Sequence, residues 1–164
     1  MAKRSAAARS GKGKSPTRQR RTRVPETSIR YVESSALVAA LLEHDTAVVA
    51  PQAAGTQHVT SALTLAKAGR AIIRARATGR LNPEQEQEAV RALQTFEQRC
   101  FVLDVDRTVL ARVRRPFPLE PIRTLDAVHL ATLELLGEAP QLVRIVTRDD
   151  RVRDNARALG FIVE

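Results

Sequence analysis

Three acidic residues stand at positions where their carboxylates could act together. Glu33 ends one short apolar run, Asp149 directly follows another, and Asp126 lies in the first turn of an apolar helix pattern. In parallel sheets covered by helices, ligands bind beyond the carboxyl ends of the strands. Carboxylates that converge there repel one another unless a cation joins them. Oxygen ligands of this kind suit Mg²⁺ or Mn²⁺, ions that activate water and bind a phosphodiester.

Each acid also has a simpler interpretation. Asp126 and Asp149 stand near expected helix starts, where a carboxylate often caps the helix or interacts with its dipole. Glu33, which precedes Ser34, is equally consistent with a solvated surface residue. The spacing of the acids by itself leaves the metal-site interpretation and these structural interpretations open.

The acids require secondary structure that brings them together, and the hydrophobic pattern predicts strands that alternate with helices. Strands are expected at residues 29–33, 58–60, 101–105, 143–147 and 161–163. Helices are expected from Ser34 or Ser35 to 42, from the cap Ser61 to Gly79, from Asn82 to about 99, from Asp106 to before Pro116, from the cap Thr124 to 136, and over 149–159. Residues 45–57 show no clear pattern. Such alternation indicates an α/β fold with a mostly parallel sheet covered on both faces.

The positive charge of the chain is concentrated at its start. The formal net charge is +9, but nine of the 27 basic residues lie in positions 1–23, which contain no acid, so the remainder is formally neutral. A segment rich in Ser, Gly, Ala and Arg buries too little apolar surface to fold. We therefore expect a disordered basic arm over residues 1–26 and one domain over 27–164. The arm is either a salt-dependent contact to nucleic acid or a dispensable extension.

The composition excludes several other classes of protein. Cys100 is the single cysteine, so an intramolecular disulfide is impossible and a cysteine-based zinc site is not expected. No apolar run approaches the roughly 20 residues of a membrane helix, and no apolar stretch follows the first cations as in a secretory signal. A reducing, cytoplasmic setting without membrane contact is expected.

Four short segments carry a further pattern. They are RYVESSALV at 30–38, VTSALTLAK at 59–67, RTLDAVHLA at 123–131 and VTRDDR at 146–151. Together with ALG at 158–160, these segments resemble the sequence blocks of PIN-domain proteins, in particular VapC-type toxins, and they occur in the order of the family. Four blocks in order at suitable spacing are fairly specific. The resemblance covers residues 29–164.

The resemblance implies a parallel three-layer α/β/α sandwich and a magnesium- or manganese-dependent endoribonuclease that activates water in a carboxylate cluster. By position, Asp126 and Asp149 match metal-site acids, Ser35 matches a hydroxyl near the cluster, and Thr147 matches the Thr before the last acid. His129 falls on an apolar helix face, where we interpret it as a core residue. RNA, an antitoxin-like protein and a second copy of the chain are the partners that the resemblance suggests.

Two residues depart from the family pattern. Glu33 stands where the family has Asp, which moves the carboxylate outward by one methylene from the geometry that Mg²⁺ favours. Lys67 stands where the family has Glu and places a positive charge beside the proposed ion. An ammonium about 4 Å from a carboxylate interacts by about 4 kcal/mol at an effective dielectric near 20, which competes with weakly held magnesium. The alternative is that Lys67 points to solvent, with its stem along the helix.

Two functional hypotheses follow. In the first, the chain is a VapC-type endoribonuclease in which Glu33, Asp126 and Asp149 hold the metal and Lys67 contacts the RNA phosphate. In the second, it is a non-catalytic PIN-like protein that binds RNA or an antitoxin-like partner. The position of Lys67 distinguishes them, since a phosphate-facing Lys favours catalysis and a Lys salt-bridged among the acids favours the second hypothesis.

Overall fold

The protein is a three-layer α/β/α structure, seen in a computed structural model that describes residues 28–43, 45, 48 and 55–164. Within these residues a five-stranded parallel sheet has the order β3-β2-β1-β4-β5. The strands are β1 (Ser28–Val32), β2 (Thr56–Ser61), β3 (Phe101–Leu103), β4 (Val143–Val146) and β5 (Ile162–Val163). The helices are α1 (Ser34–Leu42), α2 (Ala62–Ala77), α3 (Pro83–Arg99), α4 (Arg107–Val113), α5 (Thr124–Glu134) and α6 (Asp150–Ala158), with a 3-10 turn at Pro140–Leu142. The predicted fold class is confirmed, whereas the arm predicted over 1–26 lies outside the described residues.

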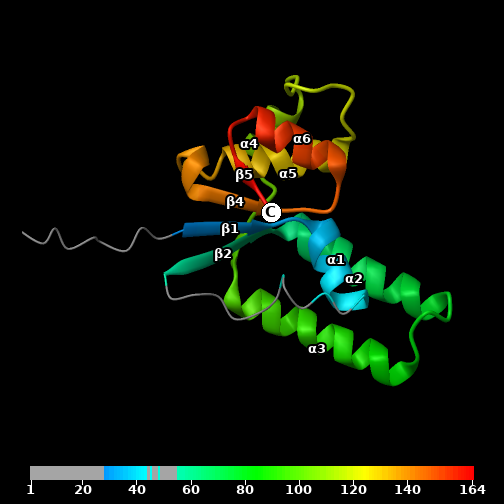
Figure 1. The fold of residues 1–164 in the computed structure, drawn as a ribbon. Helices are drawn as coiled ribbons and strands as arrows, with labels where there is room; N and C mark the ends of the chain where they lie inside the picture. The colour runs from blue at the N-terminus through cyan, green and yellow to red at the C-terminus, as the bar shows by residue number, and fades with distance from the viewer. Residues whose placement is uncertain (1–27, 44, 46–47, 49–54) are drawn as a thin grey trace, which may run out of the picture.

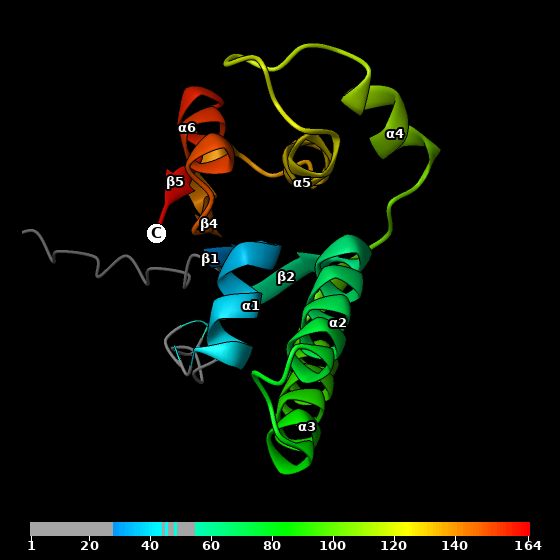
Figure 2. The same ribbon diagram turned by 90° about the vertical axis from the view of Figure 1, so that its right-hand side faces the viewer.

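The sheet separates two helical layers. Helices α1, α2 and α3 cover one face and α4, α5 and α6 the other (Figures 1 and 2). Successive side chains of a strand point to opposite faces. Accordingly Tyr31 and Ile145 pack in a core cluster with α5 and α6, while Val32 and Val146 pack in a second cluster with α1, α2 and α3. The apolar residues of both central strands are therefore buried on two faces of the sheet, as in parallel sheets covered by helices.

All five strands are parallel, but the order in which the chain adds them to the sheet changes sides between β1 and β4. From β1 the chain passes to β2 and then β3, and it returns to the other side of β1 to form β4 and β5. At such a switch point the connections after the two central strands diverge and leave a crevice at the strands' carboxyl ends. The backbone N–H of Glu33, just after β1, donates to the carbonyl of Val146 at the end of β4, at 3.0 Å. The segments that follow β1 and β4 consequently meet at this crevice.

Most of the expected helix starts are present. Ser61, Asn82 and Asp106 cap α2, α3 and α4 with their side chains, as the sequence predicts. The prediction for α5 is wrong at its cap, because Thr124 is already helical and the preceding Arg123 makes no side-chain capping hydrogen bond. None of the helices in the described part of the chain combines the length and apolarity needed to cross a membrane.

Candidate functional site

A cleft of about 1000 Å³ opens at the switch point, where the start of α5 and Asp149 line it, and it extends along α1 and α2 as far as Arg80. Its lining contains five of the six residues singled out in the sequence: Glu33, Ser35, Lys67, Asp126 and Asp149. The sixth, Thr147, is buried and donates a hydrogen bond to the Glu33 carboxylate at 3.0 Å. The fold therefore brings all six residues to one place, although they are spread over more than one hundred positions of the chain.

The Glu33 carboxylate caps α1. Its backbone is extended, and Oε2 accepts hydrogen bonds from the Ser35 amide at 2.8 Å, from the Thr147 hydroxyl at 3.0 Å and from the Ser35 hydroxyl. The side chain thus folds back over the first turn of its own helix and satisfies an amide that has no partner within the helix. The prediction that Ser34 or Ser35 caps this helix is wrong, because the longer acidic side chain occupies that position.

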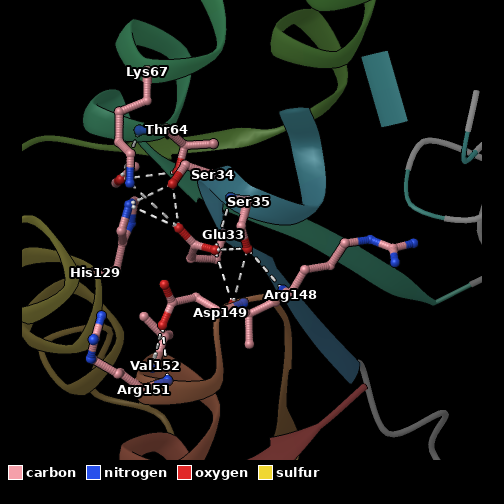
Figure 3. A network of polar contacts seen from close by, with 12 residues as sticks. Glu33, Ser34, Ser35, Thr64, Lys67, His129, Arg148, Asp149, Arg151 and Val152 are labelled. Carbon is pink, nitrogen blue, oxygen red and sulfur yellow. Dashed lines mark hydrogen bonds and ion pairs between the residues drawn. The ribbon is translucent and has the colours of Figure 1, made fainter. Parts of the chain in front are cut away.

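The second oxygen of Glu33 meets three further polar groups. Oε1 accepts a hydrogen bond from the Ser34 hydroxyl and lies 3.3 Å from His129 Nε2 and 3.8 Å from Lys67 Nζ (Figure 3). Glu33 is 1% exposed, so the interpretation of Glu33 as a solvated surface residue is wrong. The Lys67 ammonium points at this buried carboxylate, while its side chain remains about one-third exposed toward the cleft. The alternative in which Lys67 points to solvent is therefore also wrong.

His129 connects Tyr31 to Glu33 through its two ring nitrogens. Nδ1 lies 3.3 Å from the Tyr31 hydroxyl, and Nε2 lies 3.1 Å from the Ser34 hydroxyl. Burial lowers the pKa of His129 to about 4, although the charge of Glu33 acts in the opposite direction, so the ring is neutral at pH 7. We assign the protons from the network: Tyr31 O–H donates to Nδ1, Nε2–H donates toward Ser34 and Glu33, and the Ser34 O–H donates to Glu33. His129 is a core residue, as predicted, and it also holds the carboxylate.

Glu33 is ionised at neutral pH. Burial by itself would raise the pKa of its carboxyl, but the charge of a protonated His129 and the hydrogen bonds from Ser34 and Ser35 lower the pKa below its ordinary value. When His129 is neutral, the hydrogen bonds and the Lys67 ammonium at 3.8 Å keep the carboxylate charged. The site consequently contains a buried anion whose counter-ion is a side chain of the protein itself.

Acid should destabilise the protein between about pH 6.5 and pH 4. An unfolded histidine binds its proton near pH 6.5 and folded His129 near pH 4, so between these values the unfolded state binds more protons and the free energy of unfolding falls as the pH falls. Glu33 adds a loss at still lower pH, when its lowered pKa is passed. Urea unfolding at several pH values should give a decrease on the order of 1 to 3 kcal/mol. In His129→Gln the decrease should be smaller, and an unchanged pH profile would contradict this assignment.

Asp126 is an acid of the cleft with one carboxylate oxygen that no described residue meets with a hydrogen bond. It is 6% exposed, and its Oδ2 is buried with no hydrogen-bond partner among the described residues. Burial raises the pKa of its carboxyl, as does the charge of Asp149, while Lys67 acts in the opposite direction. A buried carboxylate oxygen without a donor is costly unless a ligand or cation meets it. Asp126 is therefore the carboxylate in the cleft best suited to hold a ligand.

Replacing this carboxylate should cost little stability. Asp126→Asn removes a charge that burial and Asp149 disfavour, and it also removes a favourable interaction with the α5 dipole, so the free energy of unfolding should change by less than about 1 kcal/mol. Asp149→Ala is the comparison, because Asp149 Oδ1 accepts from the amides of Arg151 and Val152 and caps α6. Its loss should cost about 0.5 to 2 kcal/mol. Denaturant unfolding of both variants gives the two values, and a larger loss for Asp126→Asn would place Asp126 in a paired network.

The donor set does not match a divalent ion bound by all three acids. Both oxygens of Glu33 already accept hydrogen bonds from protein donors, and the Lys67 ammonium lies beside one of them. Mg²⁺ requires near-octahedral oxygen ligands and tolerates such competition poorly. Over residues 28–43, 45, 48 and 55–164, no group of three or more His, Cys, Asp and Glu side chains is arranged to hold a metal ion. In this conformation Asp126 and Asp149 remain as the acids of the cleft that are not paired with Lys67.

Three basic residues in the cleft were not singled out in the sequence. Arg70, Arg74 and Arg80 line it together with Lys67. Helical spacing offered a signal, because Lys67, Arg70 and Arg74 are three and four positions apart and so share one face of α2. Because exposed cations on helices are common, this spacing by itself does not indicate a binding site; it does so only once the cleft is known.

Comparison with solved structures supports the same architecture. A chain of the VapBC2 structure from Rickettsia felis, bound to a DNA fragment from the promoter, superposes with a TM-score of 0.55 at 15% identity, covering 83% of this chain and 97% of that chain. PAE2754 from Pyrobaculum aerophilum superposes with a TM-score of 0.53 at 21% identity, covering 84% of each chain. At these identities the likeness concerns the fold.

Sequence comparison identifies the family. Residues 30–158 match the family model described as the PIN domain. Ribonuclease VapC46 of Mycobacterium tuberculosis is 37% identical over 139 residues, which covers 81% of this chain and 94% of the relative. Ribonuclease VapC35 of the same species is 31% identical over 137 residues, covering 81% of this chain and 93% of the relative. With this match along most of its length, the chain belongs to the PIN-domain family, among the VapC-type proteins.

Proposed function

We propose that this VapC-type protein binds RNA in the cleft and that its divalent-metal-dependent endoribonuclease activity is weak in the native chain. The ion pair between Lys67 and Glu33, 3.8 Å long, carries this proposal. Its relatives are named ribonucleases, which supports RNA as the ligand. A cluster of carboxylates usually needs a metal ion to balance its negative charge. Here the Lys67 ammonium provides part of that positive charge. A Lys67 that is salt-bridged among the acids favours a binding protein over an efficient nuclease.

Asp126 and Asp149 are the residues left to bind Mg²⁺ or Mn²⁺. A bound ion of this kind activates water and stabilises charge on a phosphodiester. Mg²⁺ keeps several of its waters and binds tightly only when the ligand geometry is close to ideal. With Glu33 held by Ser34, Ser35 and Thr147, we expect low metal affinity and slow cleavage.

RNA binding and metal binding should therefore separate in experiment. We expect the full chain to bind a generic single-stranded RNA in EDTA, to cleave it slowly, and to do so only with Mg²⁺ or Mn²⁺. Titration calorimetry with Mn²⁺ should show weak binding that disappears in Asp126→Asn. The native chain provides the reference for both measurements. Absence of RNA binding would overturn the proposal, and so would rapid metal-dependent cleavage by the native chain.

A second candidate ligand is an antitoxin-like protein. Its support is the apolar part of the cleft, where Val38, Leu42 and Leu63 line the wall and Leu125 is 49% exposed. Exposed apolar side chains at a cleft indicate a protein contact. The chain from Rickettsia felis that shares this fold was solved as part of VapBC2, bound to a DNA fragment from the promoter. An antitoxin-like segment bound in this part of the cleft would exclude RNA. A competition experiment in EDTA would detect this exclusion. Both RNA and an antitoxin-like protein agree with a cytoplasmic setting for this chain.

A further inference from the structure

Helix α2 presents a row of cations to the cleft. Lys67, Arg70 and Arg74 lie on one face of the helix, and all three line the cleft, as does Arg80 beyond the end of the helix. At 1.5 Å per residue, the row extends about 10 Å from Lys67 to Arg74. Its first member lies next to the buried Glu33 carboxylate, and the other members lead away from the acids along α2.

The arginines of this row lack the ion pair that the neighbouring Arg76 forms with an acid of α3, as far as the described residues show. Arg70, Arg74 and Arg80 are exposed, and in the described part of the chain no acidic side chain forms an ion pair with them. Arg76 projects from the opposite side of α2 and pairs with Glu86 of α3 at 3.4 Å. Helix α2 itself contains no acidic residue. Beyond Lys67, the row therefore consists of arginines that have no ion-pair partner among the described residues, and an anionic ligand would supply the counter-charge.

The surfaces beside these cations point to the part of RNA that they would contact. Proteins that hold single strands by their bases use aromatic side chains as stacking platforms. No Phe, Tyr, Trp or His is among the described residues that line the cleft, where aliphatic side chains such as Val38, Ala71 and Ala75 lie beside the arginines. Guanidinium groups, in contrast, match phosphate oxygens with paired hydrogen bonds. The lining favours recognition of the sugar-phosphate backbone over recognition of bases.

We propose that Arg70, Arg74 and Arg80 form a phosphate-binding track that holds a single RNA strand by its backbone, without a metal ion and with little sequence preference. The track starts beside the acids at Lys67 and follows α2 toward Arg80. This proposal rests on the proposed function, because it assumes that RNA enters the cleft. It adds that these arginines hold the strand and that they bind its phosphate groups.

The test uses the full chain in EDTA and a labelled oligouridylate of about 12 nucleotides, a length within the usual range of single-strand sites. Arg70→Gln/Arg74→Gln is compared with Arg76→Gln/Arg91→Gln, which removes the same charge from α2 and α3 outside the cleft. The track variant should lose affinity about tenfold or more, and the slope of log K against log salt should fall by about 1.4. The control variant should lose less than about twofold. Equal melting temperatures of the variants would exclude unfolding as the cause.

The outcomes separate the track from the proposed function. If the native chain binds the oligouridylate and the two variants weaken binding equally, only overall charge matters, and the track is wrong while RNA binding stands. If the native chain does not bind, the proposed function fails and the track with it. Arg70→Lys/Arg74→Lys should retain the salt slope of the native chain. If polyglutamate of similar length displaces the RNA at equal concentration, the row takes acidic protein segments and the track is overturned.

Discussion

The double variant Lys67→Glu/Glu33→Asp is expected to bind Mg²⁺ or Mn²⁺ more tightly than the native chain and to cleave RNA faster when the ion is present. Lys67→Glu removes the ammonium that lies 3.8 Å from the buried carboxylate and adds an oxygen ligand to the cleft. Glu33→Asp shortens the side chain that now folds back to cap α1, and it restores the shorter carboxylate that near-octahedral magnesium favours. Both changes act next to Asp126, whose buried Oδ2 has no partner among the described residues.

This variant should depend on metal for stability. Without an ion, the acids would face one another with no cation between them, and the melting temperature in EDTA should fall below that of the native chain. Mg²⁺ at one hundred times its dissociation constant should restore about 2.7 kcal/mol, because the ion binds the folded state preferentially. Calorimetry, melting temperatures with and without Mg²⁺, and cleavage of a generic RNA give the three readouts.

Lys67→Met is the matched control for this experiment, because it removes the ammonium without adding a ligand. It should bind metal only slightly better than the native chain. If the double variant binds Mg²⁺ no better than the native chain, then Glu33, Lys67, Asp126 and Asp149 do not converge on an ion, and the family-based assignment of a metal site to these residues is wrong.

Glu33→Gln is expected to cause a large loss of stability, about 2 to 4 kcal/mol. An amide has the same shape as the carboxylate but offers one acceptor oxygen where the native side chain offers two. Its NH₂ group would face the hydroxyl and amide donors of Ser35 and the hydroxyl of Thr147, or else Ser34 and the Lys67 ammonium. Either orientation leaves buried donors unpaired. Urea unfolding at pH 7 measures the loss.

Glu43→Gln, which changes an exposed residue at the other end of α1, is the control and should alter the free energy of unfolding by less than about 0.5 kcal/mol. A double-mutant cycle of Glu33→Gln with Lys67→Met isolates the ion pair from the hydrogen bonds. A loss for Glu33→Gln no larger than that of the control would mean that the polar network around Glu33 contributes nothing to stability.

The fold class and the location of the site were predictable from the sequence. Short apolar runs at 29–33 and 143–147 indicated strands, and the alternation of strands with helices indicated a parallel sheet covered on both faces. Parallel strands place the residues that follow them at one edge, which is why Glu33 and Asp149 were expected near each other. The limits of weaker elements were not predictable, since β2 begins at Thr56 within a stretch that shows no pattern, and β3 ends at Leu103 although alternation continues to Val105.

The sequence predicts that Glu33, Lys67, Asp126 and Asp149 gather at the switch point, whereas the way these groups pair follows from the packing of the folded chain. Glu33 caps its own helix, Lys67 neutralises Glu33, and Asp126 has an oxygen without a partner among the described residues. These roles depend on distances of about 3 to 4 Å between side chains from three helices and two strand ends. Spacing along the chain specifies the face of an element on which a residue lies. The partner it meets depends on how the elements pack and on which rotamer reaches a buried donor or acceptor first.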